Sequence, residues 1–137
     1  MRHAASILFM LCAWASAGAQ PAEPSTETFR PIITHQMEAM ERGDGAAAYD
    51  DAAPALHQRF PSAEIFMSMV KNGYPMVFAH QSYLFRGAGV DAGGRHFKRV
   101  EIHADDGAVY DAMYFMEQQG DGSWKISACV LTKVNQV

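Results

Sequence analysis

The residues best suited to chemistry lie in the segment YDAMYFMEQQGDGSWKISACVL, residues 110–131. Tyr114 offers a phenolic hydroxyl, Cys129 a thiol and Trp124 an indole N–H. The alternation of apolar side chains and the Gly-Asp-Gly turn at residues 120–122 predict two strands that bring these groups near one another. Tyr114 and Cys129 could therefore form the polar part of a ligand pocket, whereas Trp124 is best suited to packing at the hairpin.

Cys129 has two interpretations. In the first, its thiol belongs to the pocket; in the second, it fills the core, where free cysteines are commonly found. Lys125, four residues before Cys129, is a nearby positive charge that could lower the pKa of the thiol. The other cysteine, Cys12, lies in the segment that we expect to be removed, so we expect no disulfide within the chain.

Acid–base chemistry would need a carboxylate or an imidazole beside a tyrosine, as in ketosteroid isomerases and polyketide cyclases. The comparable pairs here combine His80 or Asp111 with Tyr83 or Tyr114. His80 would titrate inside a pocket if its strand face were the concave one, and would be a surface residue otherwise. The candidate pocket residues are therefore His80, Tyr83, Asp111, Tyr114 and Cys129, and none is assigned a catalytic role.

The sequence predicts no metal and no cofactor. None of the six histidines forms an HxH, HxxxH or HExxH pattern. The GAGVDAGG stretch at 87–94 lacks the lysine of a phosphate-binding loop, and no GxSxG motif is present. A net charge of −4 argues against nucleic acid as a partner, because binding to phosphates needs a basic surface.

The N-terminal segment MRHAASILFMLCAWASAGAQ has the pattern of a secretory signal. The apolar run from Ile7 to Trp14 is too short to span a bilayer, which disfavours the alternative of a transmembrane anchor. We expect a signal peptide at residues 1–19, cut after Ala19, and a flexible leader at 20–29. The mature protein would then be periplasmic or secreted, without a membrane span.

Residues 30–137 are expected to form one domain that starts with three helices. Pro31 suits the first turn of the first helix, and Gly43 its end. Asp44 and Ser62 are the expected N-caps of the second and third helices. The stripes expected to be buried are Phe29, Ile33, Met37 and Met40 on the first helix, and Ile65, Phe66, Met69 and Val70 on the third.

After Pro75 the pattern changes to alternation, which predicts strands at 77–85, 96–104, 109–119 and 124–134, with a loop at 87–94. The short turns between the last three strands require antiparallel pairing. We expect the last strand to be central, because both of its faces are partly apolar. Helices followed by such strands predict an α+β fold, in which three N-terminal helices pack on a curved antiparallel sheet of about four strands.

Several motifs in this chain resemble DUF4864, a bacterial domain family of unknown function. The resemblance covers residues 30–131 and departs from the family pattern at Ala53, where Ser usually precedes Pro, and at Ala128, where Gly usually precedes Cys. It implies an NTF2-like or SnoaL-like cone and carries over no catalytic residue. The matching positions are Gln36, Asp44, Ala53-Pro54, Phe60, Phe66, Met69-Val70, Tyr74-Pro75, Asp121-Gly122, Trp124, Ile126 and Cys129.

These observations favour a non-enzymatic module that binds a small apolar ligand or a protein partner. The nine methionines suit an adaptable pocket, although ordinary core filling explains them as well. One alternative is an isomerase- or cyclase-like enzyme that uses His80 or Asp111, and another is a purely structural envelope protein. Fold analogy also suggests a homodimer formed through the exposed face of the sheet.

Overall fold

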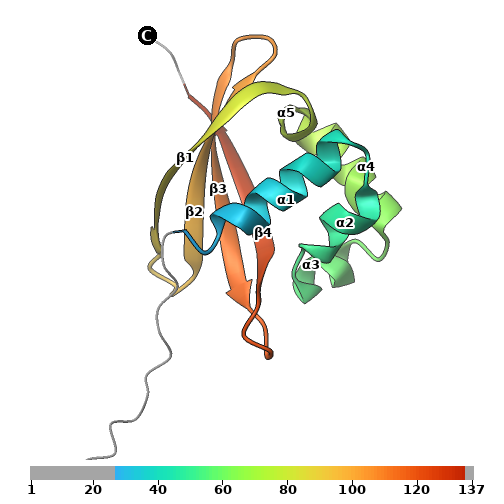
Figure 1. Ribbon diagram of the computed structural model, residues 1–137, viewed down its shortest axis with the longest axis vertical. Coiled ribbons are helices and arrows are strands. Elements are labelled where there is room, and N and C mark those ends of the chain that lie inside the picture. Colours follow the sequence, from blue (N-terminus) through green and yellow to red (C-terminus); the bar gives the residue numbers. More distant parts are fainter. Residues whose placement is uncertain (1–26, 135–137) are drawn as a thin grey trace, which may run out of the picture.

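The computed structural model describes residues 27–134. The expected signal peptide at 1–19 and residues 20–26 of the expected leader lie outside the described residues. The described chain forms five helices followed by four strands (Figure 1). The elements are α1 (Arg30–Glu41), α2 (Gly45–Asp50), α3 (Pro54–Arg59), α4 (Ala63–Gly73), α5 (Pro75–Phe78), β1 (His80–Val90), β2 (His96–Ala104), β3 (Val109–Gln118) and β4 (Trp124–Lys133).

The strands form one antiparallel sheet in the order β1-β2-β3-β4, and the helices lie together on one face of it (Figure 1). We call the helix-covered face the inner face and the opposite one the outer face. Val100, Ile102 and Ala112 are buried on the inner face, where they meet the buried side of α1. The predicted α+β class and the antiparallel pairing are confirmed.

Helices α2 and α4 begin after the N-cap residues that the sequence predicted. The Asp44 carboxylate accepts a hydrogen bond from the Ala47 N–H at 3.1 Å, and the Ser62 hydroxyl accepts one from the Ile65 N–H at 3.1 Å. Each bond satisfies one of the N–H groups that a first helical turn leaves free. The stripe predicted for α1 is buried along its whole length: Phe29, Ile33, Met37 and Met40.

The structure corrects the number of helices. The short helices α3 and α5 were not predicted, and each begins with a proline, Pro54 and Pro75, in its first turn. The fixed φ of proline suits that position. As a result, Val77 is buried in a helix, and the strand predicted from residue 77 begins instead at His80.

The loop predicted at 87–94 is also shorter than expected, because β1 continues to Val90 beyond an irregularity between Phe85 and Ala88. Gly89 leaves room for the Phe97 ring of the neighbouring strand β2. A Cβ atom at position 89 would lie 3.0 Å from Cζ of the Phe97 ring. Here glycine marks close packing rather than a turn.

The face predicted to be buried on α4 is partly wrong. Phe66 and Val70 are buried as expected, but Ile65 is 50% exposed and Met67 is buried in its place. Met67 packs against α2 at Gly45, where an added Cβ would lie 2.9 Å from the Met67 Cγ. A packing partner on another helix, rather than the apolar period of α4 alone, therefore sets its rotation.

The prediction that β4 is central is wrong, because β4 is an edge strand. Part of this edge is covered by the chain before α3. The Ile126 N–H donates to the Asp51 carbonyl at 2.8 Å, and the Ala53 N–H donates to the Ile126 carbonyl at 2.7 Å. Such covering protects the open hydrogen-bonding groups of an edge strand, and here it also holds α3 beside the sheet.

The Ser62 cap provides a test of these helix boundaries. Replacing Ser62 with Ala should lower the free energy of unfolding by about 1 kcal/mol, because the Ile65 N–H loses its acceptor. The matched control is Ser82→Ala on an exposed position of β1, which should change stability by less than about 0.5 kcal/mol. Equal effects in chemical denaturation would contradict the assigned cap.

Candidate functional site

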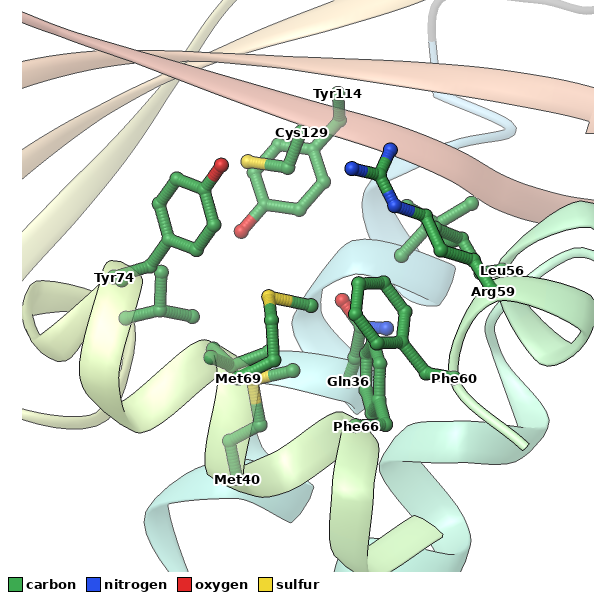
Figure 2. A pocket seen from close by; sticks show the side chains of 14 residues that line it. Gln36, Met40, Leu56, Arg59, Phe60, Phe66, Met69, Tyr74, Tyr114 and Cys129 are labelled. Carbon is green, nitrogen blue, oxygen red and sulfur yellow. The ribbon is translucent and has the colours of Figure 1, made fainter. Parts of the chain in front are cut away.

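A cavity of about 430 Å³ lies between the helices and the inner face of the sheet (Figure 2). Helices α1, α3 and α4, with the residues that directly follow α3 and α4, supply most of its wall, and α5, β3 and β4 supply the rest. The lining residues are Gln36, Met40, Leu56, Arg59, Phe60, Phe66, Met69, Val70, Gly73, Tyr74, Val77, Tyr114, Ile126 and Cys129.

Tyr114 occupies the centre of the inner sheet face. Its neighbours across the ladders are Lys98 on β2 and Cys129 on β4. The residue is 1% exposed, and its hydroxyl has no hydrogen-bond partner among the described residues. Burial raises the pKa of this phenol well above its usual value, and the neighbouring Cys129 thiol adds to the rise.

A buried hydroxyl without a partner costs roughly 1–3 kcal/mol. Figure 2 shows the hydroxyls of Tyr114 and Tyr74 and the thiol of Cys129 directed into the same part of the cavity. Thiols are weak hydrogen-bonding groups, so Cys129 cannot replace an oxygen or nitrogen partner. The Tyr114 hydroxyl in this part of the cavity therefore lacks a strong hydrogen-bond partner among the described residues.

Cys129 reaches the inner face because β4 contains a bulge. Phe115 pairs with Ala128, whereas Met116 pairs with Ile126, which leaves Ser127 as the extra residue. Simple alternation placed Ile126 and Cys129 on opposite faces. The bulge reverses the alternation, so both side chains line the cavity.

Burial raises the pKa of Cys129 to about 12, and the neighbouring Tyr114 opposes this rise only in part. The thiol therefore stays protonated near neutral pH. A protonated thiol is neither a nucleophile nor a good metal ligand. In this environment Cys129 is a small, polarizable side chain in the cavity wall.

Arg59 stands at the other side of the cavity, at the last position of α3. Its guanidinium carbon lies 5.7 Å from the centre of the Phe60 ring. Gln36 is different, because its side-chain amide already donates to the Ala48 carbonyl at 3.1 Å. Arg59 and the Tyr114 hydroxyl are therefore the polar groups most open to a new partner.

Among the lining residues there is neither a carboxylate nor an imidazole. Those two groups are the ones that most often transfer protons in catalysis. The titratable side chains at the cavity are an arginine, two tyrosines and a protonated thiol.

The structure brings Tyr114 and Cys129 together at this cavity. It also places His80 beside Tyr83, with ring centroids 5.3 Å apart, but outside the lining of this cavity. His80 lies elsewhere: its Nε2 is 2.7 Å from the Glu41 carboxylate, and its Nδ1 is 3.1 Å from the Met76 carbonyl oxygen. These contacts tie the start of β1 to α1 and α5.

The remaining two candidates also lie outside the cavity lining. Asp111 is on the outer face, where it forms an ion pair with Arg99 at 2.7 Å. Tyr83 is on the inner face near α1, and burial is the main cause of its raised pKa. No catalytic pair of His80 or Asp111 with a tyrosine is therefore assembled at this cavity.

Sequence reasoning missed Arg59 and Tyr74 as parts of the site. From the sequence, Tyr74 is named only as a position of the DUF4864 pattern, although a tyrosine that ends an amphipathic helix can turn back over the buried face of that helix. Arg59 could not be placed without α3. Lys98 was missed too: it is 4% exposed on the inner face, with its Nζ 5.9 Å from the centre of the Phe85 ring.

In residues 27–134, no group of three or more histidine, cysteine, aspartate or glutamate side chains is arranged to hold a metal ion. Within the same range, every helix is too short or too polar to cross a membrane.

The family pattern of DUF4864, described as a domain of unknown function, matches residues 22–137. This range contains the whole sheet, all five described helices and every residue that lines the cavity. The chain therefore belongs to the DUF4864 family. No curated protein matches the sequence.

The raised pKa of Cys129 predicts slow alkylation. In a Cys12→Ser chain, in which Cys129 alone can react, iodoacetamide at pH 8 should modify the folded protein about 1,000-fold more slowly than a free thiol, because so little thiolate is present. The same chain unfolded in urea is the control and should react at the ordinary rate. A folded-state rate within tenfold of the control would contradict the assigned environment.

Proposed function

We propose that this domain is a non-enzymatic binding module for a small, mainly apolar molecule with an oxygen atom that accepts a hydrogen bond from Tyr114. The observation that carries the proposal is the buried Tyr114 hydroxyl at the wall of a cavity of about 430 Å³, which has no hydrogen-bond partner within residues 27–134. A ligand oxygen there would remove the cost of leaving the hydroxyl unpaired.

The size and lining of the cavity support this proposal. Ligand pockets commonly have volumes of about 300–1,000 Å³ and are mostly apolar with a few polar groups. An apolar cavity of about 150 Å³ holds benzene, so this cavity suits a molecule of roughly 12–18 non-hydrogen atoms. Met40 and Met69 give the wall flexible side chains that can adjust to the shape of a ligand.

The fold that we propose for the domain is the NTF2-like cone. Its support is the order of helices before sheet, the covering of one sheet face by the helices, and a cavity between the two layers. We further propose that the protein is exported to the periplasm or secreted, on the basis of its N-terminal sequence pattern. Exposed Leu84 and Val130 on the outer face suit a homodimer contact.

A displacement experiment tests the binding proposal. The fluorescent probe N-phenyl-1-naphthylamine should enter the cavity, and decan-2-one should displace it. In Tyr114→Phe, the affinity for the ketone should fall roughly five- to tenfold, because one hydrogen bond is lost. Uptake of the probe should change little, since its binding depends on apolar contact.

Tyr110→Phe is the matched control, because Tyr110 is on the same strand and the same sheet face but does not line the cavity. It should bind the ketone as the wild type does. Failure of the wild-type protein to take up the probe would refute the proposed function. An equal loss of ketone affinity in both variants would refute the assigned role of Tyr114.

A further inference from the structure

The cavity carries a single formal charge, which is the positive charge of Arg59. The protein as a whole has a net charge of −4, so this local excess of positive charge is opposite in sign to the molecule around it. An arginine without a carboxylate partner at the wall of an apolar cavity is suited to receive an anion.

Arg59 differs in this respect from every other arginine in the described part of the chain. Each of the others has a carboxylate oxygen of this protein within 3.5 Å, and no such pair involves Arg59. The pairs are Arg30 with Glu27, Arg42 with Asp44, Arg86 with Glu101, Arg95 with Asp91, and Arg99 with Asp111.

The chain around Arg59 is held in place before any ligand arrives. The start of α3 is bonded to β4 through Ala53 and Ile126, and its end is fixed by the Tyr49 hydroxyl, which donates to the Phe60 carbonyl at 2.5 Å. Figure 2 shows the Arg59 side chain directed from α3 toward the cavity, across from Tyr74. Positioning of this kind lowers the entropic cost of binding.

We infer that the ligand is a monocarboxylate, with its carboxylate bound by Arg59, its apolar body against Phe60, Met69 and Leu56, and a second oxygen at Tyr114. This inference rests on the proposed function and adds the chemical class of the ligand. The planar guanidinium can bind both carboxylate oxygens at once. A neutral amide of the same shape offers one acceptor oxygen and no negative charge.

A matched pair of ligands tests the inference: 9-oxodecanoate and its neutral amide, each displacing N-phenyl-1-naphthylamine. The wild-type protein should bind the acid about three- to tenfold more tightly than the amide, because the Arg59 side chain is exposed and solvent screens part of the attraction. This preference should shrink when sodium chloride is raised from about 0.02 M to about 0.5 M.

In Arg59→Gln the preference for the acid should disappear, while the affinity for the amide stays within about twofold. Arg42→Gln is the control, because Arg42 is exposed and does not line the cavity, and it should keep the preference. The unfolding midpoint of both variants verifies that they are folded.

The outcomes separate the two proposals. Equal binding of acid and amide by the wild-type protein, or a preference that survives in Arg59→Gln, would overturn the carboxylate inference and leave the binding proposal standing. Failure of acid, amide and decan-2-one alike would overturn the proposed function itself.

Discussion

The hydroxyl of Tyr114, buried without a partner, is the constraint around which the described structure is arranged. The ladders to Lys98 and Cys129 hold the tyrosine at the middle of the inner sheet face. Hydrophobic packing buries its ring, and its neighbour on β4 is a thiol whose pKa burial raises to about 12. A fold that merely filled its core would place phenylalanine here, because the ring would be kept and the cost of the hydroxyl avoided. The proposed role for the hydroxyl is to donate a hydrogen bond to a ligand.

Two features of β4 form the cavity that this hydroxyl faces. The bulge at Ser127 turns Cys129 to the inner face, and the docking of residues 51–53 on the edge of the strand holds α3 beside the sheet. Helix α3 then carries Arg59 to the cavity, and α4 carries Tyr74. Apolar side chains, two tyrosine hydroxyls and one cation are thus combined on a wall built from both layers. The same arrangement places neither His80 nor Asp111 at the cavity, so the residues named for the isomerase-like alternative lie away from it.

The sequence predicted those parts of the fold that depend on local signals. The caps at Asp44 and Ser62, the apolar stripe of α1 and the bounds of β2 arise from neighbouring residues, and all agree with the structure. The edge position of β4, the rotation of α4 around Met67 and the bulge at Ser127 depend on contacts between distant segments, which periodicity does not contain. Tyr114 and Cys129 could be named from their strand pattern, whereas Arg59 could not, because its place depends on how α3 docks against β4.

The most direct test of the central claim is the free energy of unfolding of Tyr114→Phe in the ligand-free protein, measured by chemical denaturation beside the wild type. If the hydroxyl is buried and unpaired, its removal should leave stability unchanged or raise it by up to about 1 kcal/mol. A loss of about 1–2 kcal/mol would instead show that the hydroxyl already has a good partner inside the protein, and the cavity would lose its reason to bind a ligand at that position.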